Sequence, residues 1–262
     1  MGTVDKALAL LRHFSAQRRE IGLSDLARSA GYDKTTTLRL MASLSRYGFV
    51  EQDAGSRKYR LGLAPLSLAR IREASFPIEA VLKPRLDHLA RSLGETAHAT
   101  LISGSELLTV HVSEPDCALR IHVDPAAPMP AHATASGMAL AAYLPKDRRA
   151  ALLNATRFEQ FTPTTPKDAQ SLASRFEKIR KNGFSRADDT FEDGVTGTAV
   201  PFFDAAGLPQ GAIAVAAVTS RFDAALARRV ETDLLRTARE ITDALGGTRP
   251  KSDTARQMET AS

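Results

Sequence analysis

The pattern of apolar positions in residues 23–50, LSDLARSAGYDKTTTLRLMASLSRYGFV, predicts two short helices joined by a tight turn. Gly31 is placed to end the first helix, because glycine adopts the left-handed conformation without a Cβ clash. Asp33 is placed to cap the second helix, which we expect from Lys34 to about Tyr47. Apolar or small residues recur on that helix at the spacing of one buried face: Thr37, Leu40, Met41 and Leu44.

The opposite, polar face of the second helix predicts contact with DNA. Lys34 stands at the positive end of the helix dipole, and three consecutive threonines lose side-chain freedom there. Both costs are offset if this end faces an anion, as the second helix of a helix-turn-helix does in the major groove. A small helical hairpin with a solvated face is the alternative. The residues expected to contact phosphates or base edges are Lys34, Thr35, Thr36, Leu38, Arg39 and Ser43.

The next segment, FVEQDAGSRKYRLG, predicts a β-hairpin that turns at residues 53–56. Its second strand is basic, and it directly follows the expected recognition helix, which is the arrangement of a winged helix. Arg57 and Lys58 are therefore expected to touch the phosphate backbone or the minor groove. The alternative is an ordinary charged edge strand.

The remaining periodicity predicts an α+β protein, with an antiparallel sheet and several amphipathic helices. The expected organisation is a winged helix-turn-helix domain in residues 1–63, a linker helix in 64–76, a second domain in 77–246 and a disordered polar tail in 247–262. Helices are expected at 4–17, 64–75, 77–92, 132–144, 147–154, 166–182 and 222–245. Strands are expected at 97–101, 107–112, 119–123, 199–203 and 211–218, with a turn at 103–105.

Charge supports this division of the chain. The net charge is +5, but residues 1–72 hold 13 Lys/Arg and 6 Asp/Glu, a net +7, so the remainder carries −2. A basic first quarter on a slightly acidic body is typical of a nucleic-acid-binding module joined to another domain. The chain has one cysteine, Cys117, and hence no internal disulfide framework. It has no apolar run near ~20 residues and no signal-peptide pattern, so we expect a soluble cytoplasmic protein.

Motifs of catalysis are missing from the sequence. It contains no P-loop, no GxGxxG after a strand, no GxSxG and no HExxH. Four histidines, at 98, 111, 122 and 132, lack the tight spacing of metal ligands, and no cysteine pair joins them. We therefore expect neither an enzyme nor a bound metal or cofactor. The alternative kept open is an enzyme or sensor with a vestigial helix-turn-helix.

Several segments together resemble the IclR family of bacterial transcriptional regulators. They are TVDKALALLRHF, the helix pair with its hairpin, KYRLGLAPLSLA, GETAHATLISGSELLTVHV, PAHATASGMALAAYLP and GVTGTAVPFFDAAGLPQGAIAVAAV. The resemblance covers about residues 3–245 and implies a GAF-like effector-binding domain behind the DNA-binding domain. It also implies a palindromic DNA operator and a homodimer or tetramer, for which we expect contacts through Leu10 of the first helix and Leu68 of the linker helix.

A small-residue loop that enters a helix at 132–137 leaves backbone N–H groups free to hold a carboxylate. In the resembled family, the matching segment closes over a small-molecule effector. The effector-binding residues expected there, by resemblance or as polar partners of a ligand, are His98, Ala118, Leu119, Arg120, His132, Ala135, Ser136, Gly137, Asp188, Gly197, Ala214 and Ala216.

Three of these positions depart from the well-known small-acid binders of the family, which carry a cysteine where this chain has Gly197 and serines where it has Ala214 and Ala216. The wall strand 211–218 then presents alanines at alternate positions on one face. Such a wall gives room and no hydroxyl, which favours a small aromatic carboxylate or a related catabolic intermediate. A short keto acid is the alternative effector.

Overall fold

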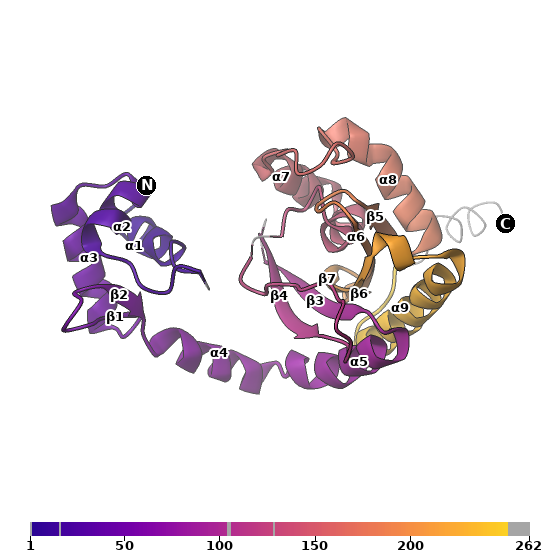
Figure 1. Cartoon of the computed structure of the whole chain (residues 1–262), viewed down its shortest axis with the longest axis horizontal. Helices are drawn as coiled ribbons and strands as arrows, with labels where there is room; N and C mark the ends of the chain where they lie inside the picture. The colour runs from indigo at the N-terminus through magenta and orange to yellow at the C-terminus, as the bar shows by residue number, and fades with distance from the viewer. Residues whose placement is uncertain (1, 16, 104–105, 128, 251–262) are drawn as a thin grey trace. The chain divides into compact units, whose positions relative to one another are not determined.

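The computed structural model describes residues 2–15, 17–103, 106–127 and 129–250 (Figure 1). The chain divides into two compact units, Met1–Pro77 and Ile78–Ser262, and each is described by itself. Residues 104 and 105 of the turn expected at 103–105 lie outside the described ranges, and so do residues 251–262 of the expected tail.

The first unit is a helix-turn-helix followed by a two-stranded wing and a further helix. Asp33 accepts a hydrogen bond at 2.7 Å from the Thr36 N–H, and Gly31 takes the left-handed conformation with φ +70°, so both predicted helix boundaries are confirmed. The elements are α1 Thr3–Leu11, α2 Leu23–Ala30, α3 Lys34–Arg46, β1 Val50–Gln52, β2 Tyr59–Leu61 and α4 Ala64–Ser75.

The core of this unit confirms the predicted apolar face of α3. Thr37, Leu40, Met41 and Leu44 are all buried, and the last three pack with residues of α1, α2 and the wing. The first helix is shorter than predicted, since α1 ends at Leu11. The expectation that Leu10 contacts a second copy of the chain is wrong, because its side chain is fully buried in this core.

The second unit is a five-stranded antiparallel sheet in the order β4-β3-β7-β6-β5, with helices on both faces. Its strands are β3 Thr96–Ser103, β4 Glu106–Ser113, β5 Ser185–Asp188, β6 Val195–Phe203 and β7 Pro209–Val218. Its helices are α5 Ile78–Leu93, α6 Ala135–Tyr143, α7 Lys146–Ala155, α8 Ala169–Asn182 and α9 Ala224–Ala244, with a 3-10 turn at Thr219–Arg221.

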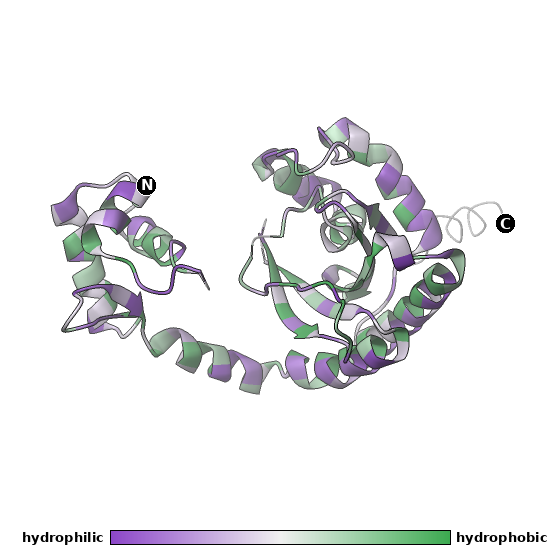
Figure 2. Cartoon of the chain, viewed as in Figure 1, coloured by the Kyte–Doolittle hydropathy of each residue, from purple (hydrophilic) through white to green (hydrophobic). Residues whose placement is uncertain are grey.

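Each face of the sheet has its own core. Helices α5 and α9 cover one face, where Leu86 and Leu234 pack against strand residues such as Ile213. Helices α6, α7 and α8 cover the other, where Met138 and Phe176 pack with alanines of the strands. Figure 1 shows both helical layers, and Figure 2 shows hydrophobic and hydrophilic bands along α5 and α9, as expected of helices with one buried side. The α+β class with an antiparallel sheet is confirmed.

Several local features of the structure differ from the predictions. Residues 119–123 form no strand and instead run as a loop, in which the Ile121 carbonyl accepts a hydrogen bond at 2.5 Å from the Thr96 hydroxyl. Strand β5 was not expected, and α6 begins at Ala135 rather than at 132. Residues 247–250, where disorder was expected, are part of the described structure, and the Thr248 N–H donates to the Asp204 carbonyl at 2.9 Å.

Candidate functional site

The exposed face of α3 carries the residues predicted to contact DNA. Five of them are exposed and Thr36 is half-buried; the exposed ones are Lys34, Thr35, Leu38, Arg39 and Ser43. The bond from the Thr36 N–H lowers the pKa of Asp33, so this cap is ionised at neutral pH. The cap fixes where the helix starts and hence the direction in which its first turn projects.

The wing is held in shape by its own turn. Asp53 accepts a hydrogen bond at 2.7 Å from the Ser56 N–H, which lowers the pKa of the Asp53 carboxyl. Arg57 takes a left-handed conformation with φ +59°, and its carbonyl accepts from the Gln52 side-chain amide at 2.8 Å. Two hydrogen bonds, from the Ser56 N–H to Asp53 and from the Gln52 amide to the Arg57 carbonyl, therefore fix the basic turn of the wing.

The basic residues of the wing differ in what they contact. The Arg60 Nε donates to Glu51 across the two strands at 2.6 Å. Arg57 and Lys58 are exposed and form no ion pair with any residue in the described part of the chain. Two cations of the wing are therefore available to an anionic partner, and the third is neutralised locally.

A cavity of about 240 Å³ lies in the second unit, between the sheet and the start of α6. Six predicted ligand residues line it: His98, Ala135, Ser136, Gly197, Ala214 and Ala216. Its volume is slightly below the ~300–1,000 Å³ typical of pockets for drug-sized ligands, so it suits a smaller molecule.

The floor of the cavity is set by strand register. Ala214 of β7 pairs with His98 of β3 on one side and with Ala199 of β6 on the other. Ala216 pairs with Gly197, which pairs with Ala187 of β5. Because residues two apart in a strand point to the same face, these rows give a floor of methyl groups and one glycine, with a single imidazole at its β3 end.

Gly197 is the point at which α6 approaches the sheet. A Cβ added there would lie 3.3 Å from the Cβ of Ala135, the first residue of α6. The start of the helix therefore sits above β6, and any larger residue at Gly197 would fill the space between them.

The first turn of α6 has hydrogen-bonding groups left over. The Thr134 hydroxyl accepts from the Gly137 N–H at 3.1 Å. Among the described residues, the N–H groups of Ala135 and Ser136 have no acceptor, and the buried Ser136 hydroxyl has no partner. A helix N-terminus with free N–H groups attracts a negative charge.

His98 is the second buried polar residue of the lining without a partner. It is 6% exposed, and neither ring nitrogen hydrogen-bonds to any residue that the structure describes. Burial lowers the pKa of His98 to about 4, so the imidazole is neutral at physiological pH. The buried threonines of the lining differ, since Thr190 donates to the Ala133 carbonyl at 2.6 Å and Thr134 is bonded as described.

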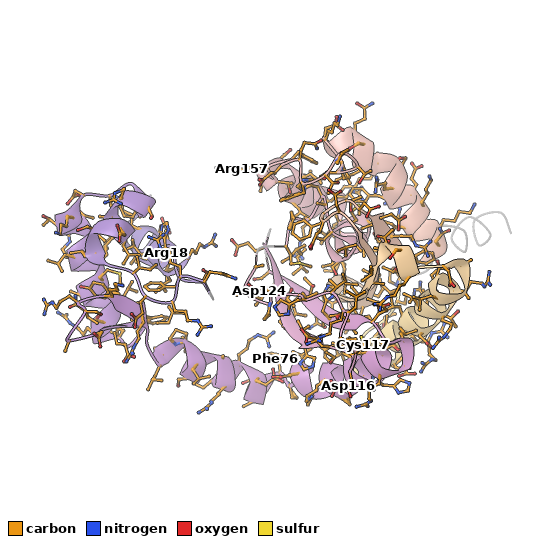
Figure 3. The ribbon with its side chains drawn as sticks, in the orientation of Figure 1. Arg18, Phe76, Asp116, Cys117, Asp124 and Arg157 are labelled. Atoms are coloured by element: carbon orange, nitrogen blue, oxygen red, sulfur yellow. The ribbon has the colours of Figure 1, made fainter. Side chains whose placement is uncertain are left out.

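Side chains from two loops surround the mouth of the cavity. His122 and Asp124 come from the loop after β4, on which Figure 3 labels Asp124 together with Asp116 and Cys117. Phe191 and Glu192 come from the loop after β5, and the Phe191 ring stacks edge-on against Phe161 with centroids 4.9 Å apart.

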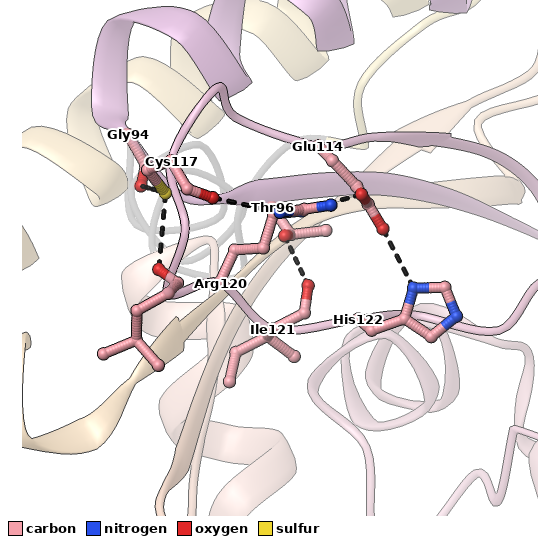
Figure 4. Close-up of polar contacts among 8 residues, drawn as sticks. Gly94, Thr96, Glu114, Cys117, Arg120, Ile121 and His122 are labelled. Atoms are coloured by element: carbon pink, nitrogen blue, oxygen red, sulfur yellow. Dashed lines mark hydrogen bonds and ion pairs between the residues drawn. The ribbon is translucent and has the colours of Figure 1, made fainter.

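Several predicted ligand residues lie outside the lining. Arg120 donates from Nε to Glu114 at 2.7 Å, and the His122 Nδ1 lies 2.9 Å from the other Glu114 oxygen (Figure 4). The guanidinium is thus held by a carboxylate on the loop, and Leu119 beside it is 62% exposed. Ala118 belongs to the same loop segment and does not line the cavity.

Three more predicted ligand residues have other contacts. The His132 Nε2 lies 2.9 Å from the Glu159 carbonyl, and its ring packs edge-on against Phe158. Gly137 packs against the backbone of Ala131, and its N–H donates a hydrogen bond to the Thr134 hydroxyl. Asp188 is exposed at the end of β5.

Sequence reasoning missed the other residues of the lining, most of which lie in loops. They are Ile121, His122, Val123, Asp124, Ala127, Met129, Ala133, Thr134, Ala187, Thr190, Phe191, Glu192 and Val195. The alternation of Ile121 and Val123 was the available signal, but it was interpreted as a strand. Ala187 could not be placed, because β5 itself was not expected.

No helix among the described residues combines the length and apolar character needed to cross a bilayer. No group of three or more His, Cys, Asp or Glu residues among them is arranged to hold a metal ion.

Known proteins and protein families match almost the whole length of this chain. The family profile described as "Bacterial transcriptional regulator IclR C-terminal" matches residues 74–243, and "IclR helix-turn-helix domain" matches residues 3–54. The HTH-type transcriptional regulator XynR of Escherichia coli K12 is 28% identical over 244 residues, which cover 93% of this chain and 97% of that protein.

Solved structures agree with these matches. The crystal structure of a putative ICLR transcriptional regulator from Silicibacter sp. TM1040 has a TM-score of 0.89 and 38% identity, over 96% of this chain and 99% of that one. An IclR homolog from Microbacterium hydrocarbonoxydans, complexed with 4-hydroxybenzoate, has a TM-score of 0.78 and 21% identity, over 93% and 99% of the two chains. At that identity the second likeness shows the fold alone.

Proposed function

Because the chain belongs to the IclR family of bacterial transcriptional regulators, we propose that it binds a palindromic DNA operator. A small aromatic carboxylate that enters the cavity between the sheet and α6, the α6 cavity, makes the protein dissociate from the operator or change its arrangement on it. The family is one of regulators, not of enzymes, so the alternative of an enzyme with a vestigial helix-turn-helix is set aside. What remains to be assigned is the operator contact, the assembly and the chemistry of the effector.

The operator contact rests on α3 and the wing. The first half of α3 presents the exposed side chains of Lys34, Thr35 and Arg39, and the Arg39 guanidinium suits the O6 and N7 acceptors of guanine. Arg57 and Lys58 supply phosphate contacts, which carry affinity rather than sequence preference. One such module covers a small footprint, so two half-sites and two copies of the chain are needed for specific binding.

The proposed assembly is a dimer through the DNA-binding half and a dimer of dimers through the effector domains. Exposed apolar side chains support the first contact. On α4 these are Leu66, Leu68 and Ile71, and on α1 they are Val4 and Leu8. The proposed contact on α1 therefore uses Val4 and Leu8 instead of Leu10, which is buried. Exposed apolar residues gathered along one helix are typical of a surface that another chain covers.

The effector class follows from the chemistry of the lining. The unpartnered N–H groups of Ala135 and Ser136, with the Ser136 hydroxyl, carry the proposal, because they favour a carboxylate at the helix N-terminus. Ala214, Ala216 and Gly197 give a flat apolar floor against which an aromatic ring packs. A two- or three-carbon keto acid would leave that floor uncovered.

Ligand binding shifts a regulator only by its differential affinity for the operator-competent and incompetent arrangements. A mobility-shift assay on the DNA upstream of the protein's own gene tests the operator. Calorimetry against benzoates and short keto acids tests the effector. Tight binding of glyoxylate or pyruvate, with none of any aromatic acid, would refute the aromatic assignment and favour the keto-acid alternative.

A further inference from the structure

We infer that His98 selects effectors that carry a second, uncharged hydrogen-bonding group at the end of the ring away from the carboxylate. This inference rests on the proposed function, since it assumes an aromatic acid in the α6 cavity. It narrows the effector class from aromatic acids in general to ring-hydroxylated aromatic acids.

The first argument is an accounting of the buried polar groups of the lining. The hydroxyls of Thr134 and Thr190 are satisfied by backbone carbonyl partners. Ser136 and His98 are left without partners among the described residues, although both are more than nine-tenths buried. Buried polar groups in proteins are nearly always hydrogen-bonded. Other buried polar atoms of this chain also lack a partner, but His98 and Ser136 line the cavity, where a ligand or water can supply one.

The second argument is the separation of the two groups across the sheet. Ser136 follows Ala135, which sits above Gly197 of β6, whereas His98 lies on β3. Strand β7 runs between β6 and β3, so the two strands are about 10 Å apart at the ~4.8 Å strand spacing. A molecule whose carboxylate lies at α6 must extend across β7, over Ala214 and Ala216, to reach the imidazole. A ring with a polar substituent opposite or next-but-one to the carboxylate has that extent, and a short keto acid does not.

The third argument is the charge of the partner. The strand neighbours of His98 on either side, Ala214 and Val112, are uncharged, and the two carboxylates of the lining, Asp124 and Glu192, come from loops outside the sheet. The imidazole is therefore a neutral donor on one nitrogen and an acceptor on the other. A phenolic hydroxyl, which also both donates and accepts, matches it, whereas a second carboxylate would be buried against alanines without a counter-charge.

The test is isothermal calorimetry of the full-length protein with four acids: benzoate, 3-hydroxybenzoate, 4-hydroxybenzoate and 4-methylbenzoate. The methyl compound has nearly the shape of the 4-hydroxy compound and cannot hydrogen-bond. We expect one of the hydroxybenzoates to bind about tenfold or more tightly than 4-methylbenzoate. In His98→Leu this preference should fall to about twofold or less, while benzoate affinity stays within a fewfold of wild type. His98→Gln, which keeps a donor and an acceptor, should retain part of it.

A matched control is His122→Leu, which alters a histidine at the mouth of the same cavity and should leave the preference intact. Thermal unfolding of each variant shows that loss of binding is not loss of fold. Equal binding of the hydroxy and methyl acids to wild type, or an unchanged preference in His98→Leu, would overturn the role of His98 and leave the proposed aromatic effector standing. Binding of none of the four acids would overturn both.

Discussion

Gly137 of α6 lies directly against the backbone of Ala131: a Cβ added to Gly137 would be 2.5 Å from the Ala131 Cα and 2.6 Å from its carbonyl oxygen. Both contacts are with backbone atoms, which cannot turn aside. The glycine thus lets the helix start close to the loop that precedes it, and it acts on the ligand site by placing Ala135 and Ser136.

Gly137→Ala should therefore destabilise the second unit by about 1–3 kcal/mol, because the helix must move to relieve the overlap. Urea unfolding followed by circular dichroism measures this loss. Gly197→Ala is the control, since its nearest neighbour is a side-chain methyl at 3.3 Å and the expected loss is smaller. Equal stability of Gly137→Ala and wild type would contradict the close packing.

Arg39→Ala should weaken binding to the operator by about 1–3 kcal/mol and relax the preference at one base pair. The reason is that Arg39 is exposed on the first half of α3, where a recognition helix meets base edges. Fluorescence anisotropy with operator variants measures both effects. Unchanged operator affinity would show that α3 does not enter the groove as proposed.

The wing supplies a matched comparison for that experiment. Arg57→Ala or Lys58→Ala should weaken binding to all sequences alike and reduce the salt dependence by about one counterion. Arg60→Ala should do less, because the Arg60 Nε is already held by Glu51 at 2.6 Å. A larger loss for Arg60→Ala than for its two neighbours would contradict this division of roles.

Periodicity predicted most of the fold, because buried helices and half-buried strands impose it directly. The α3 stripe and the alternate alanines of β7 are examples, and both occur as expected. Strand β5 could not be predicted, since SRAD is too short and too polar to show an alternating pattern. Residues 119–123 alternate for another reason: Ile121 and Val123 line the cavity while Leu119 is exposed, in a loop without a strand partner.

The ligand site was less predictable than the fold. Which residues face Ala214 depends on the register of β3 and β6 against β7, which no local pattern fixes. Arg120 was expected in the ligand site by resemblance to the family and as a possible charged partner of a ligand. Its actual partner, Glu114, is six positions away on the same loop, and only the folded loop brings the two together.

The exposed apolar residues of α4 predict a self-association that charge would disrupt. Leu68→Glu combined with Ile71→Glu should weaken the dimer, because Leu68 is 53% and Ile71 61% exposed and both would be buried in it. Analytical ultracentrifugation at micromolar concentration gives the result. A monomeric wild-type chain would refute the proposed assembly, and an undiminished dimer in the double variant would place its contact elsewhere.

His98 makes the fold sensitive to mild acid. Its pKa is lowered to about 4 in the folded chain against an ordinary value of ~6.5, so the unfolded chain binds more protons between these values. Stability is therefore retained above pH ~6.5 and falls as the pH is lowered toward 4. Between pH 7.5 and 5 this residue should account for a loss of about 2 kcal/mol, which His98→Gln should lack. Urea unfolding of both proteins at the two pH values tests it; parallel losses would contradict a buried, neutral His98.

The central claim is that a small aromatic acid in the α6 cavity controls operator binding, and one titration tests it most directly. Labelled operator DNA is held half-saturated with protein, and benzoates, glyoxylate and pyruvate are added in turn while anisotropy is followed. The same titration is carried out with the variant Ala214→Phe. Its added ring fills the floor of the cavity beside His98, and the substitution does not alter α3 or the wing. We predict that an aromatic acid shifts operator affinity in the wild type, that the keto acids do not, and that Ala214→Phe binds the operator normally but no longer responds. A shift with glyoxylate or pyruvate alone, or an aromatic response that persists in Ala214→Phe, would contradict the account.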